Sequence, residues 1–317
     1  MSVAPPVSIL LPVRDAAPFL EEALDSLRAQ TFTELEILVH DDGSADDSLA
    51  VAKRLAAADA RIRVHAEPAH GIVHALNALA ARARGDLLVR MDADDVAAPT
   101  RVERLVEAAS EHPQAGFFAS RVRYIPREGL SAGLLRYETW INGLLDHASI
   151  LRDRFVECPL PHPAWAIRRD VFTRLGGYAE GPFPEDYELF LRAVDAGVRF
   201  HKVGEVLLDW REGAHRLSRT SPRFSRSAFF ELKARHLVPF LRAQGRPVRV
   251  LGTGPAGRRW AKRLRAADLD VEAVDDVAAR TDAFALATQG TPEGRAETRD
   301  RLRAAGMEEE RDFLCVQ

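Results

Sequence analysis

The sequence predicts an α/β protein in which a mostly parallel sheet is covered by helices on both faces, followed by a second, smaller α/β unit. Strand and helix signals alternate through the first hundred residues. The strand segments there are continuous apolar runs, which are typical of strands buried on both faces. The composition changes at "GRPVRVLGTGPAGRRWAKRL", residues 245–264, where a new strand, glycine turn and helix begin.

The run "VSILLPV" at residues 7–13 predicts the first strand, and Asp15 is placed to cap the helix that follows. That helix would bury one apolar face, formed by Leu20, Ala23, Leu24 and Leu27. The next strands are expected at residues 35–40, 61–65 and 86–91, and the next helices at 45–58, 71–83 and from Pro99 onward. Proline is favourable at a helix start because the N–H it lacks has no partner there.

The middle of the chain is less regular. Strands are expected at 116–125, after the proline-rich segment 159–169, and at the start of 206–220; helices are expected at 134–156, 184–197 (ended by Gly197) and 225–244. Beyond the break, strands are expected at 269–276, 283–288 and 312–316, with a helix at 292–305. We therefore expect two domains, residues 1–244 with a linking helix at about 225–244, and residues 245–317.

Composition excludes several classes of protein. The chain has 317 residues, 46% of them hydrophobic, and a net charge of −3, so no basic field points to a nucleic acid partner. Its two cysteines, Cys158 and Cys315, are far apart, which favours a reducing cytoplasm over a disulfide framework. No apolar stretch approaches the roughly 20 residues needed to span a bilayer. Peripheral membrane contact stays open.

The stretch "LLVRMDADDV", residues 87–96, places Asp92, Asp94 and Asp95 directly after an apolar run. Like charges this close repel unless a cation lies among them. Ligands bind at the carboxyl ends of strands in open α/β sheets, and Mg²⁺ or Mn²⁺ takes one or two carboxylates plus substrate phosphates. Two alternatives are a solvated acidic turn and the D-x-D-x-[TV] signature of haloacid-dehalogenase-like phosphatases, in which Asp92 would be the nucleophile.

The stretch "LVHDDGS", residues 38–44, places two more carboxylates at the end of an earlier strand. A phosphatase of that type does not need them, whereas a nucleotide site does. A carboxylate there can accept the imide N–H of uracil or a ribose hydroxyl. The alternative is an Asx-type turn leading into the helix near Asp46.

The sequence resembles the family 2 inverting glycosyltransferases of the GT-A fold over roughly residues 7–235. The resemblance rests on "VSILLPVRD", "LDSLRAQTF", "ILVHDDGSADDS", "GIVHALNALAARARGDLLVRMDADD", "GGYAEGPFPEDYELFLRAVDAG" and "VLLDWREGAHRLSRT", in that order. It implies a mixed GT-A sheet flanked by helices, and a metal-dependent transferase that uses Mg²⁺ or Mn²⁺.

The resemblance also implies roles for single residues. The backbone of Pro12 and the side chain of Arg14 would line the base pocket, and Asp42 would accept from the base. Asp92 would face the ribose or the metal, and Asp94 would be the main metal ligand.

On the acceptor side, Asp186 would be the general base and Glu185 would support it. Inversion needs such a base opposite the departing diphosphate. The alternative is an acidic first helical turn favoured by the helix dipole. Many relatives have a metal-binding histidine in an Arg-x-His pattern; "WREGAHR" displaces His215 from that position, and a surface histidine is an equal alternative.

Other residues near these motifs have two interpretations each. Trp165 could stack on a sugar or belong to the core. Arg90, Arg101 and Arg211 are candidate diphosphate partners, although an arginine-rich chain must place most arginines on its surface.

The second unit contains G-x-G-x-x-G at Gly252, Gly254 and Gly257, between a predicted strand and helix. Asp275 and Asp276 follow the next strand, near the spacing of a ribose-binding acid. The unit resembles the Rossmann-like appendix of some bacterial glycosyltransferases, and we expect a structural or regulatory role that includes nucleotide binding.

The sequence thus predicts transfer of a sugar from a nucleotide donor, UDP-linked, to a glycan or lipid-linked acceptor in surface polysaccharide synthesis. We expect the protein to lie in the cytoplasm. Any peripheral membrane contact would be at the inner face of the membrane. Two other functions stay open: an NAD(P)-dependent oxidoreductase that uses Gly252–Gly257, and a non-catalytic partner that binds sugar nucleotides.

Overall fold

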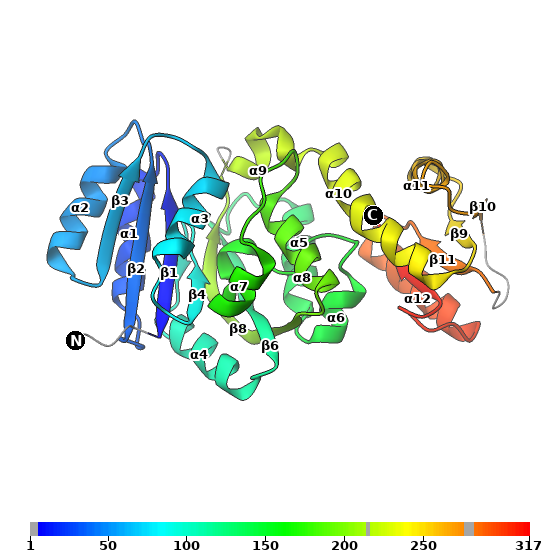
Figure 1. Ribbon diagram of the computed structural model, residues 1–317, viewed down its shortest axis with the longest axis horizontal. Helices are drawn as coiled ribbons and strands as arrows, with labels where there is room; N and C mark the ends of the chain where they lie inside the picture. The colour runs from blue at the N-terminus through cyan, green and yellow to red at the C-terminus, as the bar shows by residue number, and fades with distance from the viewer. Residues whose placement is uncertain (1–5, 214–215, 276–281) are drawn as a thin grey trace. The chain divides into compact units, whose positions relative to one another are not determined.

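The computed structural model describes residues 6–213, 216–275 and 282–317 (Figure 1). The chain forms two compact units. The larger comprises Met1–His147, Leu160–Gly181 and Glu185–Thr220, and the smaller comprises Ala148–Pro159, Pro182–Pro184 and Ser221–Gln317. The smaller unit therefore begins before the predicted linking helix and includes it. Whether a fragment ending near residue 244 folds alone stays a prediction.

The larger unit is built on one mixed sheet of eight strands in the order β3-β2-β1-β4-β7-β6-β8-β5. The strands are β1 (Val7–Val13), β2 (Leu35–Asp42), β3 (Ile62–Glu67), β4 (Leu87–Arg90), β5 (Val96–Ala97), β6 (Ala115–Ile125), β7 (Ala166–Arg168) and β8 (Arg199–Arg211). Strands β1 to β4 are mutually parallel, whereas β7 runs antiparallel to β4 and β6. The predicted mixed sheet flanked by helices is confirmed.

Helices lie between these strands. They are α1 (Ala17–Arg28), α2 (Ser48–Ala58), α3 (Ile72–Arg82), α4 (Arg101–Glu111), α5 (Ala132–Gly143), α7 (Arg169–Leu175), α8 (Glu185–Asp195), α9 (Leu217–Thr220) and the 3₁₀ turn η1 (His162–Ala164). Helix α6 (His147–Arg152) begins at the last residue of the first segment of this unit. Among the described residues, no helix is long and apolar enough to cross a membrane.

Alternation along β2 separates the two faces of the sheet. Ile37 and Val39 join the core cluster that contains the buried faces of α1 and α2. The side chains of Leu38 and His40 point to the opposite face, since successive residues of a strand alternate. Helix α3 contacts β1 and β2. The predicted apolar face of α1 is confirmed: Leu20, Ala23, Leu24 and Leu27 are all buried.

The predicted capping of α1 by Asp15 is wrong. Ala16 occupies the cap position, and its N–H donates to Ser48 Oγ at 2.8 Å. The N–H of Ala17 donates to Asp46 Oδ2 at 2.9 Å. In return, Asp15 Oδ1 accepts the N–H of Ala45 at 2.7 Å. The loops after β1 and β2 are therefore joined by reciprocal hydrogen bonds, a pairing between distant segments that local sequence does not reveal.

The single helix predicted at 134–156 is also wrong, because α5 ends at Gly143 and α6 begins at His147. Just before the break, Asn142 Oδ1 accepts the N–H of Val122 at 2.9 Å, and Asn142 Nδ2 donates to the Val122 carbonyl at 2.7 Å. The carbonyl of Leu145 accepts the N–H of Lys202 at 2.9 Å. Pairing with β6 and β8 thus replaces the helical hydrogen bonds.

The smaller unit contains a second, wholly parallel sheet in the order β10-β9-β11-β12. Its elements are η2 (Pro222–Phe224), α10 (Arg226–Gln244), β9 (Val248–Leu251), α11 (Pro255–Arg265), β10 (Val271–Val274), β11 (Phe284–Ala287), α12 (Pro292–Ala304) and β12 (Phe313–Cys315). After Gly252 at φ 111°, a Cβ on Gly257 would lie 1.7 Å from the Gly252 carbonyl oxygen. Only glycine fits at residue 257, so the motif closes a tight strand-to-helix turn.

Candidate active site

The predicted site residues of the larger unit meet at one edge of its sheet. Pro12 lies near the end of β1, Asp42 ends β2, and Asp92 follows β4. These three strands are parallel neighbours, so their carboxyl ends lie together. The order of the strands alone therefore assembles the base and metal residues that the sequence predicts.

Asp92, Asp94 and Asp95 form a carboxylate cluster whose oxygens lie within 4.8 Å of one another. Arg90, only 5% exposed, donates from Nη2 to Asp92 Oδ1 at 2.5 Å. Asp95 is 1% exposed, and its Oδ1 accepts the N–H of Arg211 at 2.7 Å. Its Oδ2 is buried and has no hydrogen-bond partner among the described residues. A buried oxygen in this state requires a proton or a cation.

The electrostatics of the cluster favour a bound cation. Burial, reinforced by the charge of Asp92, raises the pKa of Asp94 to about 6. Burial and the charges of Asp92 and Asp94 raise the pKa of Asp95 well above its ordinary value. Asp94 and Asp95 therefore retain protons at a pH where isolated aspartates are ionised. Hard oxygen donors in this arrangement fit Mg²⁺ or Mn²⁺, which would displace those protons.

Two arginines from the end of β8 and the following segment border the cluster. Arg211 Nε donates to the backbone carbonyl of Asp94 at 2.7 Å. The Arg216 guanidinium lies 4.4 Å from the ring centre of Trp210 and donates to Glu212 at 3.0 Å. Its charge opposes the rise in the pKa of Asp94. Sequence reasoning named Arg211 but missed Arg216, which the closing "WREGAHR" segment could have suggested; His215 lies outside the described residues.

Arg101 does not contact a diphosphate, contrary to one interpretation of the sequence. It is fully buried and donates from Nη2 to the carbonyls of Arg90 at 2.6 Å and Pro163 at 2.7 Å. Trp165 is likewise a core residue, fully buried with its indole N–H donating to the Leu160 carbonyl at 3.1 Å. Through its contact with the Arg90 carbonyl, Arg101 supports the segment that leads into the cluster.

The start of α3 fixes the carboxylate of Asp42. Asp42 Oδ1 accepts the N–H of His70 at 2.7 Å, and Oδ2 accepts the N–H of Gly71 at 2.9 Å. The exposed Arg14 has its Nη1 3.7 Å from Asp42 Oδ2. Each carboxylate oxygen has two lone pairs, so Asp42 retains capacity to accept from a base. The structure thus brings Arg14 and Asp42 together next to Pro12.

Glu185 and Asp186 occupy the first turn of α8. Glu185 is 3% exposed, and Asp186 Oδ1 accepts the N–H of Tyr187 at 2.7 Å. Burial raises the pKa of the nearby Tyr178 phenol; Arg90 opposes this shift, and Asp186 and Glu185 add to it. The acids of α8 and the arginine that holds Asp92 thus act on one buried phenol.

Sequence reasoning assigned no role to Tyr178. Its hydroxyl lies 2.8 Å from His162 Nε2. Burial and the charge of Arg90 lower the pKa of His162, which is therefore neutral. The sequence signals for this pair were His162 in "PHPAWAIRRD", residues 161–170, and the tyrosine of the "GGYAEG" turn that follows.

A separate groove lies elsewhere in the larger unit. It has a volume of about 1020 Å³ and is lined by residues that include Asp86, Arg168 and Arg169. Asp86 precedes β4, so the groove lies at the amino end of that strand and away from the carboxylate cluster. None of the predicted site residues line it.

In the smaller unit, β10 and β11 lie on opposite sides of β9, and Gly252 follows the end of β9. Ligands bind at such a change of direction in open α/β sheets. The carboxylate of Asp275 accepts the Thr253 hydroxyl at 2.5 Å, so the predicted ribose acid lies against the glycine turn. Asp276 is outside the described residues.

The larger unit has the fold of the GT-A glycosyltransferases, which is the class of protein that its sheet and site define. A model of "Glycosyl transferase family 2" matches residues 8–176, more than half of the chain. The chain belongs to glycosyl transferase family 2.

Relatives and solved structures agree with this assignment. The uncharacterized glycosyltransferase EpsJ of Bacillus subtilis is 30% identical over 68% of this chain and 63% of its own length. The O-antigen biosynthesis glycosyltransferase WbnJ of Escherichia coli is 25% identical over 74% of this chain and 89% of its own. TarS of S. aureus, solved with UDP-GlcNAc, has the same fold, with a TM-score of 0.57 at 17% identity over 74% of this chain and 66% of its own. The chain thus spans less than two thirds of EpsJ and of that TarS structure.

Proposed function

We propose that this chain is a metal-dependent inverting glycosyltransferase that moves a sugar from a UDP-linked donor to a glycan or lipid-linked acceptor in surface polysaccharide synthesis. The observation that carries the proposal is the carboxylate cluster of Asp92, Asp94 and Asp95, beside Asp42 on a neighbouring strand. Its raised pKa values and unpaired oxygen suit a divalent cation that faces a diphosphate. The reaction would take place in the cytoplasm, with any acceptor lipid at the inner face of the membrane.

The named relatives support the polysaccharide and nucleotide-sugar parts of the proposal at a coarse level. WbnJ is named for O-antigen biosynthesis, and AmsE of Erwinia amylovora, 30% identical over 62% of this chain, is named for amylovoran biosynthesis. TarS was solved with UDP-GlcNAc, whereas the mannosyltransferase PcManGT of Pyrobaculum calidifontis was solved with GDP-Man and Mn²⁺ (TM-score 0.51, 23% identity). The choice of UDP over GDP rests on the family resemblance, because the Asp42 carboxylate could accept an N–H from uracil or from guanine.

The mechanism assigns separate tasks to the two acidic centres. Asp94 and Asp92 would hold Mg²⁺ or Mn²⁺, which when bound neutralises the charge of the departing diphosphate. Asp186 takes the proton of the acceptor hydroxyl while that oxygen forms a bond to the anomeric carbon. The bond from this carbon to the diphosphate oxygen breaks, and the diphosphate leaves with the electron pair.

Calorimetry with UDP, with and without Mn²⁺, tests the donor half of the proposal. Wild type should bind UDP in a Mn²⁺-dependent manner and GDP more weakly, whereas Asp94→Asn should lose the Mn²⁺ dependence. Asp86→Asn is the matched control, because its side chain is 90% exposed and lies at the other end of β4. Equal Mn²⁺-linked binding to wild type and Asp94→Asn would remove Asp94 from the metal site, and preference for GDP would overturn the choice of base.

We also infer that the smaller unit is a regulatory or structural appendix that binds a nucleotide through Gly252, Gly254, Gly257 and Asp275. The close packing of the glycine turn and the position of Asp275 beside it support this inference. Binding of NAD or ADP to wild type, and its loss in Asp275→Ala, would be the expected result. Turnover of a nicotinamide cofactor would instead favour the oxidoreductase.

A further inference from the structure

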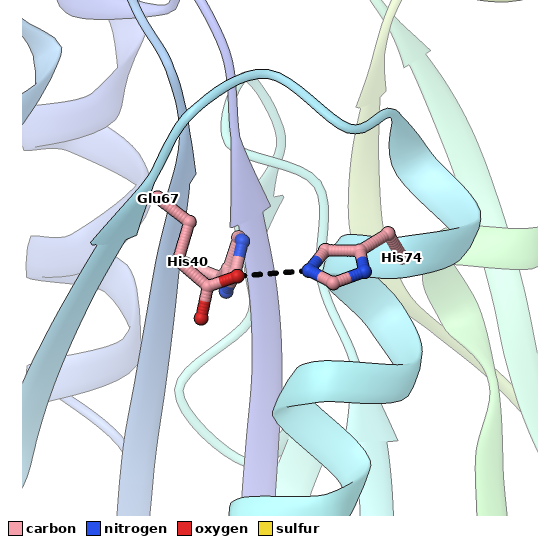
Figure 2. Close-up of side chains that lie close together, drawn as sticks. All are labelled: His40, Glu67 and His74. Carbon is pink, nitrogen blue, oxygen red and sulfur yellow. Dashed lines mark hydrogen bonds and ion pairs between the residues drawn. The ribbon is translucent and has the colours of Figure 1, made fainter.

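A second cluster of potential ligands lies on the α3 face of the sheet in the larger unit. His40 is in β2, Glu67 is the last residue of β3, and His74 is in the first turn of α3 (Figure 2). One ligand atom from each residue lies within 4.8 Å of the others. Period-two alternation places His40 and Glu67 on the same face, since Asp42, two residues after His40, pairs with Glu67. Three separate elements therefore converge on one point.

His40 is fully buried, yet neither ring nitrogen has a hydrogen-bond partner among the described residues. A buried imidazole normally satisfies both nitrogens, so this side chain lacks a ligand that would do so. Burial lowers the pKa of His40, although Glu67 and Asp42 oppose this shift. The ring is therefore neutral, which is the form that coordinates metals.

Glu67 and His74 are already oriented toward the same point. His74 Nε2 lies 2.8 Å from Glu67 Oε2, the contact drawn in Figure 2. The other oxygen, Oε1, accepts from Arg82 at 3.0 Å. The hydrogen bond from His74 lowers the pKa of Glu67, so the carboxylate is ionised. Arg82 thus fixes the carboxylate, as outer partners of metal ligands commonly do.

We propose that His40, Glu67 and His74 bind a divalent transition-metal ion of the Zn²⁺ class. Two imidazoles and one carboxylate form a donor set that suits Zn²⁺ or Co²⁺ and not Mg²⁺, which prefers oxygen. The side chain of His74 is 43% exposed, which leaves a path for the ion and a fourth position for water. The hydrogen bond between His74 Nε2 and Glu67 Oε2 joins two of the ligand atoms, and a bound ion would replace it.

The site adjoins the base pocket. Asp42 follows His40 by two residues and holds the N–H of Gly71, three residues before His74. An ion bound to His40 and His74 would therefore join the end of β2 to the start of α3. This link would reinforce the hydrogen bond between Asp42 and the N–H of Gly71, which joins the same two segments. The proposal does not require the transferase activity, because its ligands are separate from the carboxylate cluster.

Titration of the full-length, chelator-treated protein with Co²⁺ in excess Mg²⁺ tests this site. Bound Co²⁺ should give a visible absorption spectrum with one equivalent bound, and Zn²⁺ should displace it. Glu67→Gln and His74→Gln, at accessible positions, should weaken Co²⁺ binding at least about 100-fold, more than the usual loss of an outer partner. His40→Leu should do the same, with circular dichroism to verify its folding.

Two variants serve as controls. Asp94→Asn removes the oxygen-rich cluster and should bind Co²⁺ like wild type. His112→Gln alters a separate histidine pair, in which the rings of His112 and His201 stack with their centres 3.8 Å apart, and should also bind like wild type. The proposal is overturned if wild type binds no Co²⁺, if folded Glu67→Gln and His74→Gln bind it as tightly as wild type, or if either control abolishes the spectrum.

Discussion

Without a cation, the carboxylate cluster should destabilise the fold, and Asp94→Asn should relieve that cost. The folded-state pKa of Asp94 is about 6, against an ordinary value of 3.8. Because the folded state binds this proton more tightly, its stability falls as pH rises through the window between these values. The cost is about 3 kcal/mol near pH 7.5 and roughly half of that near pH 5.

Urea unfolding of wild type and Asp94→Asn in the presence of chelator measures this cost. The variant should be more stable near pH 7.5 by about 1–3 kcal/mol, since the amide removes the charge but keeps the size. The gap should shrink toward pH 5, and saturating Mn²⁺ should stabilise wild type only. Asp86→Asn should show none of these effects. Equal stabilities near pH 7.5, or a gap that grows as pH falls, would refute the assignment of a desolvated carboxylate.

Three further predictions concern the base, the small unit and the boundary. Asp186→Asn should lower transfer at least about 100-fold with UDP affinity and Tm nearly unchanged; near-normal turnover would move the role to Glu185. Gly257→Ala should unfold the smaller unit in circular dichroism and proteolysis, since its Cβ would lie 1.7 Å from a backbone oxygen; an unchanged melting curve would contradict the tight turn. A fragment of residues 1–244 should fold and bind UDP but melt at a lower temperature than the full chain. The reason is that Phe230 loses its contact with Trp260, whose ring centre lies 4.4 Å from that of Phe230. An insoluble fragment would show that the smaller unit is integral to the enzyme domain.

The elements predicted well from sequence are those in which a local run of apolar residues indicates that the segment is buried. Strand β1 matches the prediction residue for residue, because every position of 7–13 is buried and apolar or small. Strand β5 was missed, since two residues form a strand only by pairing with β8, Val96 opposite Asp209. The first seven residues of β8 were missed for the same reason, because their pairing with β6 lies eighty residues away in sequence.

The candidate site divides in the same way. Asp42, Asp92 and Asp94 follow apolar runs, so parallel strand order alone predicts that they meet. Tyr178 and Arg216 reach the site from turns whose path depends on the assembled sheet, and no periodicity marks them. His40 was hidden inside a buried strand, where a histidine resembles any core residue until its missing partners are visible.

The reciprocal hydrogen bonds between the loops after β1 and β2 limit how donor specificity could be re-engineered. Asp15 secures the second loop at Ala45, while Asp46 and Ser48 secure the first. Grafting one of these loops from a related transferase would leave unpaired donors in both. A transplant should therefore carry both segments as one cassette, and single-loop chimaeras should fail through misfolding before their sugar preference can be measured.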